Sequence, residues 1–196
     1  AGANSRHTAH PGTTTRRAPT TQPNTTPCHP RATFNAHTQP KIQKMKKTFQ
    51  TLADLAACAG QEVAVSDWIT ITQEQVNQFA DATGDHQWIH IDVEKAKAGP
   101  FGAPIAHGFL TLSLLPRFFQ EAIEVVESRM GVNYGLNRVR FMSPVPVGSR
   151  LRATLRLQAC QALPDDGMQM TWLVTVEREG GDKPVCVAES ITRRYA

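Results

Sequence analysis

The stretch that decides the fold is GDHQWIHIDVEKAKAGPFGAPIAHGFLTLSLL, which runs from Gly84 to Leu115. Its first part gathers two histidines and two aspartates beside a glycine, and its last part is an almost wholly apolar run that opens at His107-Gly108. A segment that is apolar nearly all round predicts a helix buried on every side. Polar groups that converge beside apolar elements are typical of a small-molecule pocket. The stretch therefore predicts an active site at the start of a central helix.

The central helix is expected to begin at Ala106 and to be buried through Leu115. Farther along, amide and acidic side chains indicate a solvated helix face: Gln120, Glu121, Glu124 and Glu127. Pro116 lies inside this pattern, where proline removes a helical hydrogen bond at a cost of about 3 kcal/mol. We therefore expect either a kink at Pro116 or two abutting helices.

The chain before Gly84 predicts two helices and a strand. Apolar spacing favours a short helix over residues 49–59, and the alternation in residues 62–70 favours a strand. Thr72 and Gln75 have the spacing of a capping box for a helix from Gln73 to Ala82. Because Gly84 ends that helix, Asp85 is expected in irregular backbone, where a side chain can point into a cleft. One more helical turn is expected over residues 95–98, before the glycines and prolines of residues 99–104 interrupt regular structure.

The rest of the chain predicts antiparallel sheet. Alternating runs bounded by turn residues occupy residues 133–142, 150–162, 168–178 and 184–194. Short polar turns make consecutive strands antiparallel neighbours. With the earlier strand, about five strands must cover one buried helix. The predicted fold class is α+β, an antiparallel sheet wrapped around a long central helix.

The first 44 residues differ from the rest in composition. They contain six arginines and lysines, no acidic residue and scarcely a large apolar side chain before Ile42, so we expect a disordered N-terminal extension. Two explanations compete, a transit-type peptide and sequence upstream of a natural start at Met45, and the ordinary beginning Met-Lys-Lys-Thr-Phe-Gln favours the second. Residues 45–196 are then expected to form one domain.

Composition excludes several classes of function. Residues 45–196 hold fifteen basic and seventeen acidic residues, so the folded part gives little reason to expect nucleic-acid binding. Four widely spaced cysteines suggest neither a disulfide framework nor a zinc site. No run approaches the roughly 20 apolar residues that span a bilayer, and no secretory signal is evident. We expect a cytoplasmic protein with no membrane partner.

Asp85 and His90 are the first candidates for chemistry. A carboxylate and an imidazole on one short loop can hold a water between them and move a proton from one atom to its neighbour. The alternative is that both side chains only satisfy backbone groups. His86 and His90 also raise the possibility of a metal, but the segment lacks the glutamate of H-E-x-x-H and follows a helix-ending glycine, so no metal is expected.

Gly108 is the second candidate. A glycine has no side chain to keep a ligand from its N–H, and the first turn of a helix leaves its donors unpaired, which together describe an oxyanion hole. The alternative is that Gly108 only allows close packing of the buried helix. Five arginines lie on alternate positions of two predicted strands and could bind a phosphate: Arg138, Arg140, Arg150, Arg152 and Arg156. Solvated sheet edges, however, explain most such patterns.

Several ordered motifs carry a family resemblance. The D-x-x-x-x-H from Asp85 to His90, the following ID-x-E-x-A, and the run G-P-F-G-x-P-I-A-H-G-F-L-T-L-S-L-L-P resemble the MaoC-like dehydratases, especially single-domain (R)-specific enoyl-CoA hydratases and nodulation protein N-like members. The later GVNYGLNRVRF and PVPVGSRLRA are similar to that family too, so the resemblance covers roughly residues 47–196.

The resemblance implies a hot-dog fold, a homodimer whose sheets join edge to edge, and a lyase of fatty acid metabolism. That lyase reversibly hydrates trans-2-enoyl-CoA to the (R)-3-hydroxyacyl-CoA. Asp85 and His90 would activate the water and shuttle the proton, and the Gly108 N–H would polarise the thioester carbonyl. No cofactor is implied beyond the coenzyme A of the substrate. The expected substrate-binding residues are Gln87, Trp88, His107, Phe109, Thr111, Leu112 and Ser113.

Two departures from the family pattern bear on the site. Many such hydratases read D-x-N-P-x-H, where this chain has Gln87-Trp88, and a serine of some members falls near Pro116, which leaves Ser113 as the nearest hydroxyl. Two other functions compete with hydration. One is thioester hydrolysis, although hot-dog thioesterases commonly place a carboxylate on or beside the central helix, and the other is non-catalytic binding of acyl-CoA.

Overall fold

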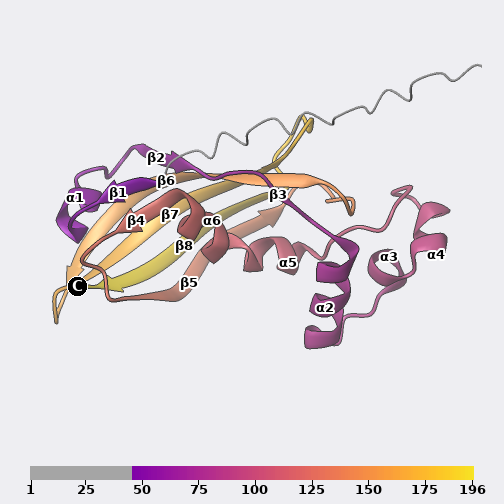
Figure 1. Ribbon diagram of the computed structural model, residues 1–196, viewed down its shortest axis with the longest axis horizontal. Helices are drawn as coiled ribbons and strands as arrows, with labels where there is room; N and C mark the ends of the chain where they lie inside the picture. The colour runs from indigo at the N-terminus through magenta and orange to yellow at the C-terminus, as the bar shows by residue number, and fades with distance from the viewer. Residues whose placement is uncertain (1–45) are drawn as a thin grey trace, which may run out of the picture. The chain divides into compact units, whose positions relative to one another are not determined.

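The computed structural model describes residues 46–196, so the expected extension over residues 1–44 and the start at Met45 lie outside the described residues. Four long strands dominate this part of the chain: β5 (Met130–Phe141), β6 (Arg150–Leu163), β7 (Gly167–Arg178) and β8 (Cys186–Tyr195). Together with two short strands, β2 (Glu62–Val65) and β3 (Ile69–Thr70), they form an antiparallel sheet in the order β2-β6-β7-β8-β5, with β3 also paired to β6 (Figure 1). The predicted α+β class and hot-dog arrangement are confirmed.

Apolar side chains alternate with polar ones along the strands, so they gather on one face of the sheet, and that face is buried. Every second residue of β6 from Leu151 to Leu157 is fully buried, and Thr154 and Arg156 between them point the other way. Strand β7 shows the same alternation, with Trp172 and Val174 buried. A one-residue shift in register would turn these side chains to solvent, so the alternation fixes the pairing.

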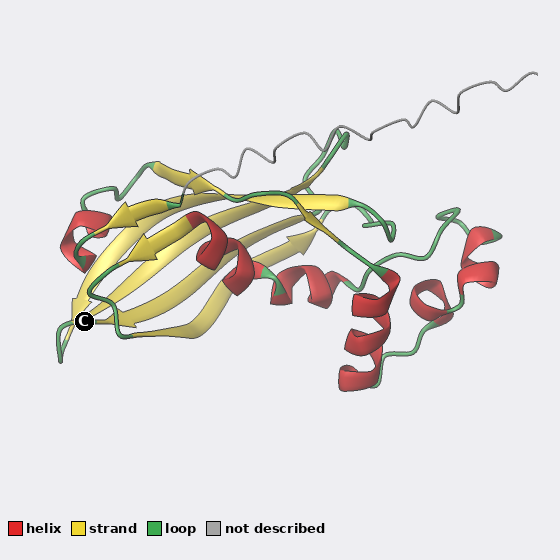
Figure 2. Ribbon diagram, in the orientation of Figure 1, coloured by secondary structure: helices red, strands yellow, loops and turns green. Residues whose placement is uncertain are grey.

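The central helix is two abutting helices that lie beside the long strands of the sheet (Figure 2). Helix α5 (Gly108–Ser113) ends at Leu114, and α6 (Leu115–Ala122) begins at once, with Pro116 in its first turn. Proline is tolerated there because those N–H groups have no helical partner. Of the two sequence expectations, abutting helices are therefore confirmed. The expected burial on every side is wrong for α5, since Phe109 is 67% exposed.

The chain after Ala122 does not continue as helix. Residues Ile123–Val125 form β4, which pairs in parallel with β1 (Lys47–Phe49). This pairing corrects two expectations, because it removes Phe49 from the first predicted helix and removes Glu124 and Glu127 from the predicted helix face. β-branched residues in this stretch favour a strand, but the partner strand lies 76 residues earlier.

The first helix, α1, is consequently short. It covers Leu52–Ala56 and begins with a capping box between Thr51 and Asp54. The predicted strand over residues 62–70 is two pieces, β2 (Glu62–Val65) and β3 (Ile69–Thr70). Between them the Ser66 hydroxyl accepts a hydrogen bond from the Ala153 N–H at 2.9 Å and takes the place of a ladder bond.

Three helices beyond the sheet carry the site segment. Helix α2 (Gln73–Thr83) has the predicted capping box at Thr72 and ends at Gly84, whose φ of 77° is the left-handed cap. Helix α3 (Trp88–Ile91) is a single turn in a stretch expected to be irregular. Helix α4 (Val93–Lys97) follows and covers most of the predicted extra turn. Figure 1 shows α2, α3 and α4 together beyond the end of α5.

A helix able to cross a bilayer would need to be longer and more continuously apolar than any in residues 46–196.

Candidate active site

Three hydrogen bonds join the segment around α3 to the segment that leads into α5. The Ile105 N–H donates to the Ile89 carbonyl at 3.0 Å, and the His90 ring and the Ile105 carbonyl lie 2.7 Å apart. The third bond joins the His107 ring to the Asp85 carbonyl at 2.9 Å. These bonds bring residues 85–90 and 105–108 side by side, which gathers the polar groups of the deciding stretch at one place.

His90 is 6% exposed, and two hydrogen bonds hold it in place, one through its ring and one through its backbone carbonyl. A carbonyl oxygen only accepts hydrogen bonds, so the hydrogen shared with Ile105 belongs to His90 Nδ1. The other nitrogen, Nε2, then keeps a lone pair in the neutral ring. The Gln73 side chain also donates from Nε2 to the His90 carbonyl at 2.8 Å, which ties α3 to the first turn of α2.

The pKa of His90 is lowered, chiefly because burial disfavours the charged ring. A positive charge on neighbouring His107 would lower it further, whereas the hydrogen bond to Ile105 and the carboxylate of Asp85 raise it. The net effect keeps His90 neutral at pH values where an ordinary histidine begins to take up a proton. A neutral ring with a free Nε2 is the form in which histidine acts as a base.

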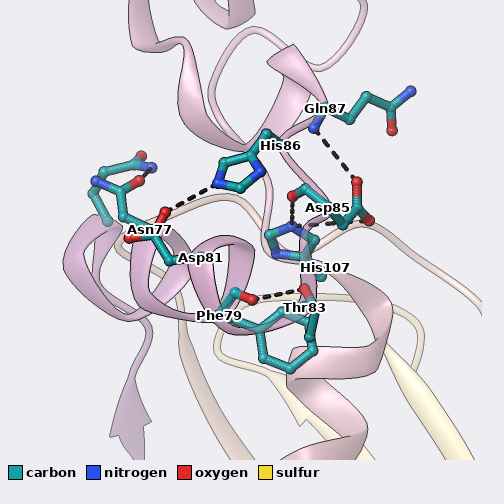
Figure 3. Close-up of polar contacts among 9 residues, drawn as sticks. Asn77, Phe79, Asp81, Thr83, Asp85, His86, Gln87 and His107 are labelled. Carbon is teal, nitrogen blue, oxygen red and sulfur yellow. Dashed lines mark hydrogen bonds and ion pairs between the residues drawn. The ribbon is translucent and has the colours of Figure 1, made fainter.

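Asp85 follows the left-handed Gly84 directly, and its side chain is about half exposed at 55%. Its Oδ1 accepts a bond from the Gln87 N–H at 3.4 Å (Figure 3). One ligand atom each from Asp85, His90 and His107 lies within 4.8 Å of the others. That separation leaves room for one water to contact both the Asp85 carboxylate and the His90 ring.

His107 is buried beside Asp85, His90 and helix α2. Its ring stacks on His90 with centroids 3.8 Å apart and planes 27° apart, and it packs against Phe79 at 5.0 Å. Its Nε2 lies 2.9 Å from the Asp85 carbonyl and 4.0 Å from Asp85 Oδ2 (Figure 3). His107 therefore contacts both residues predicted to do the chemistry.

The cluster of Asp85, His90 and His107 has the composition and spacing of a group that could hold a metal ion. A histidine nitrogen binds a metal in the plane of its ring. The planes of the two stacked rings are 27° apart, which is unfavourable for both lone pairs to point at one ion, and rotation of a ring would improve the geometry. Rotation of His90 would break its bond to Ile105.

Two cavities meet at His90 and Gly108. The larger, of about 330 Å³, has mainly apolar walls: Phe101, Ile105, Ala106, Phe141, Met142, Pro144, Val145 and Val185, with Thr111 and Ser143. The smaller, of about 200 Å³, is lined by Phe79, Thr83, Asp85, His107 and Phe109. A ligand with an apolar chain and a polar reacting group could therefore place its reacting group where the cavities join.

The structure brings together six of the ten residues that the sequence singled out. Asp85, His90, His107, Gly108, Phe109 and Thr111 all line a cavity. The other four, Gln87, Trp88, Leu112 and Ser113, line neither. The Trp88 side chain packs against Gly99 and Lys95, and the Ser113 hydroxyl donates to the Phe109 carbonyl.

Sequence reasoning missed several wall residues. Phe79 and Thr83 come from α2, where only the apolar spacing of the helix hinted that Phe79 faces inward. Phe141, Met142 and Val145 come from the end of β5 and the turn after it. Phe141 lies directly on Gly108, because a β carbon at that glycine would meet the Phe141 ring at 2.9 Å. No local pattern signals a contact across 33 residues.

Other polar candidates of the sequence have structural partners. His86 pairs with Asp81 at 3.0 Å on the surface, which raises the pKa of His86, and Asp92 caps α4 through the Lys95 N–H. The arginines of β6 are also engaged. Arg150 pairs with Glu179 and Arg152 with Glu177, both beside the Trp68 ring, and Arg156 donates to the Gly60 carbonyl.

The fold and the site together define a hot-dog domain with an aspartate and a buried histidine at the start of its central helix. Residues 54–179 match the family described as MaoC like domain. The chain belongs to the MaoC-like dehydratase family.

Relatives and solved structures agree with this assignment. The chain is 59% identical over 150 residues to 3-hydroxyacyl-thioester dehydratase Z of Mycobacterium tuberculosis, an alignment that covers 76% of this chain and 99% of that one. It is 49% identical to nodulation protein N of Rhizobium leguminosarum, over 72% of this chain and 89% of that one. The R-hydratase PhaJ1 of Pseudomonas aeruginosa shares the fold, with a TM-score of 0.56 and 24% identity over 70% of this chain and 81% of that one.

Proposed function

We propose that the protein is a hydro-lyase that reversibly adds water to a trans-2-enoyl-CoA and forms the (R)-3-hydroxyacyl-CoA. The observation that carries the proposal is the buried His90, whose Nδ1–H bonds to the Ile105 carbonyl, whose pKa is lowered by burial, and which has a ring nitrogen within 4.8 Å of an Asp85 carboxylate oxygen. The named activity of the M. tuberculosis relative, a 3-hydroxyacyl-thioester dehydratase, supports the same reaction.

Hydration adds a hydroxyl to the β carbon and a hydrogen to the α carbon of the enoyl thioester. In the proposed mechanism one water lies between Asp85 and His90, and the pair takes its proton as the new C–O bond forms. The electrons of the double bond move toward the thioester oxygen, and the α carbon then receives the proton from the pair. Dehydration is the same sequence in reverse.

The Gly108 N–H is proposed to stabilise the negative charge that develops on the thioester oxygen. Gly108 is the first residue of α5, the preceding His107 supplies no side-chain cap, and Gly108 contributes to both cavities. An N–H without a helical partner is available to a ligand. The larger, apolar cavity suits the acyl chain of the substrate, with Thr111 at its wall.

Crotonyl-CoA is the direct test of this function. The enoyl thioester absorbance should fall on addition of the protein, with no release of free thiol, and the product should be the (R) alcohol. Release of free thiol would instead identify a thioesterase, and tight binding without either change would identify an acyl-CoA-binding protein. Helix α5 contains no acidic residue, which gives hydrolysis little support from its side chains.

We further propose a homodimer formed through β5. This strand lies at the end of the sheet order, and it exposes apolar side chains: Met130, Val132, Tyr134, Leu136 and Phe141. A long apolar edge strand favours pairing with a second copy. Sedimentation should give a dimer for the wild type and a monomer for Leu136→Asp. A monomeric wild type would contradict the proposal.

The remaining expectations belong to the same proposal. The reaction needs no metal and no cofactor beyond the coenzyme A carried by the substrate, and the stacked rings of His90 and His107, with planes 27° apart, support the metal-free form. A cytoplasmic role in fatty acid metabolism is proposed from the substrate class and the widely spaced cysteines. Dialysis against a chelator should leave turnover unchanged.

A further inference from the structure

His107 is a buried polar side chain that lines the smaller cavity and also contacts both residues predicted to do the chemistry. It is 3% exposed and occupies the residue before α5, yet its side chain does not cap that helix. One face of its ring lies on His90, and Phe79 packs against it. Buried polar groups are nearly always hydrogen-bonded, so the partner of this ring indicates its role.

That partner is the backbone of Asp85. The Asp85 carbonyl can only accept, so His107 Nε2 carries the hydrogen of the 2.9 Å bond. Asp85 follows the left-handed Gly84 and lies outside any helix or strand. Within residues 46–196, the bond from His107 is the hydrogen bond that its carbonyl makes. The His107 side chain therefore holds the backbone that aims the Asp85 carboxylate.

The contact with His90 constrains the second member of the pair. Stacked imidazoles 3.8 Å apart limit rotation of the His90 ring about its bond to Ile105. Two positive charges at this distance repel each other. Among the described residues, the charged or titratable groups that affect His90 are His107 and Asp85, and His107 acts to lower the pKa of His90.

We infer that His107 is a positioning residue of the hydratase: its Nε2–H fixes the Asp85 backbone, and its ring face holds His90 in place. This inference rests on the proposed hydration for its kinetic consequence. His107 Nδ1 is buried with no hydrogen-bond partner in residues 46–196, which leaves the carbonyl bond and the stack as the contacts that define the residue.

Two substitutions separate the two contacts. His107→Gln keeps an N–H donor for the Asp85 carbonyl but removes the stacked ring, whereas His107→Phe keeps a stacked ring but removes the donor. Because a misplacement of about 1 Å in a catalytic group can cost about 10²-fold, His107→Phe should lower kcat by about 10–10² with crotonyl-CoA. His107→Gln should stay within about tenfold of the wild type. KM should change less than kcat in either variant, since the two contacts act on Asp85 and His90.

The pH profile supplies a readout that a purely structural role would not move. His107→Gln removes a group whose charge lowers the pKa of His90 and puts no apolar ring in its place, so that pKa should rise, whereas His107→Phe keeps the burial that lowers it most. The acidic limb of kcat/KM, which reports the free enzyme's base, should then move to higher pH in His107→Gln. A raised KM at unchanged kcat would return His107 to substrate binding. If both variants lost kcat equally and the acidic limb of kcat/KM did not move, His107 would have only a packing role.

An NMR titration keeps the inference independent of the proposed reaction. The His90 ring carbon signals, assigned with His90→Gln, should titrate at higher pH in His107→Gln than in the wild type, whether or not crotonyl-CoA is hydrated. An unshifted His90 titration would overturn the contact with His90. A wild type that fails to hydrate crotonyl-CoA would overturn the proposed function, and the titration would still decide the role of His107.

Discussion

The sheet with α6 and the segment from Gly84 to Gly108 are built in opposite ways. The sheet is held by long ladders and by apolar side chains such as Leu155 and Trp172 that are almost fully buried. The segment contains helices of four and five residues and is joined by a few hydrogen bonds, two of them from histidine rings to backbone carbonyls. The difference teaches that stability and chemistry reside in separate parts of one domain, so a substitution in one should spare the other.

Substitution of either catalytic candidate should give the largest loss of activity. Asp85→Asn removes the carboxylate charge at constant shape, and His90→Gln removes the titrating nitrogen. Each should lower kcat for crotonyl-CoA by at least about 10², because general acid–base catalysis contributes about 10²–10⁴. The urea midpoint should hardly change for Asp85→Asn, whose side chain is half exposed. If Asp85→Asn lowered both kcat and the urea midpoint of unfolding strongly, the two regions would not be separable in this way.

A core substitution should show the reverse pattern. Leu155 is fully buried on β6, and leucine-to-alanine changes in cores cost about 2–5 kcal/mol in free energy of unfolding. Leu155→Ala should therefore lower the urea midpoint, while kcat per folded molecule stays the same. Gln158→Ala, exposed on the same strand, is the matched control and should change stability by less than about 0.5 kcal/mol. A large fall in kcat for Leu155→Ala would couple the core to the chemistry.

Gly108→Ala tests the point where the two regions touch. The new methyl would meet the Phe141 ring at 2.9 Å, and Phe141 is 43% exposed, so the ring can move outward while the fold is kept. The N–H remains, so we expect a loss of kcat of about tenfold, below the roughly 10²–10³ for removal of an oxyanion donor. Phe141→Ala is the control. The double variant Gly108→Ala/Phe141→Ala separates a loss caused by displacement of the Phe141 ring from a loss caused by the methyl group beside the Gly108 N–H. Full recovery in the double variant would assign the loss to Phe141 and return Gly108 to a packing role.

Removal of residues 1–44 should have the smallest effect. These residues contain no acidic group and scarcely a large apolar side chain, so they have little apolar surface to bury. A chain that starts at Met45 should keep its Tm within about 2 °C and its full turnover. A loss of several degrees would mean that the first 44 residues contribute to the domain and that the comparison needs a third region.

The same division decides what could be predicted from the sequence. Strands β5 to β8 were predicted to within three residues at each end, because alternation and turn residues are local signals. The helix expected through Glu127 and the one expected from Phe49 were wrong because β1 and β4 pair with each other. That pairing depends on contacts between distant segments, which no local pattern contains.

The candidate site was predictable in part. The motifs around Asp85, His90 and Gly108 carried a family resemblance, and the structure places all three at the joined cavities. The bond from His107 to the Asp85 carbonyl joins a side chain to a backbone atom 22 residues away. Such a bond leaves no sequence pattern, because any residue at position 85 would supply the same carbonyl.

The most direct test of the central claim, that Asp85 and His90 handle one proton together, is the double variant Asp85→Asn/His90→Gln. Residues that act as a unit lose about as much singly as together. We predict that kcat of the double variant with crotonyl-CoA lies within about fivefold of the worse single variant. A double variant whose loss equals the product of the two single losses would mean that the residues act independently, and it would contradict this account.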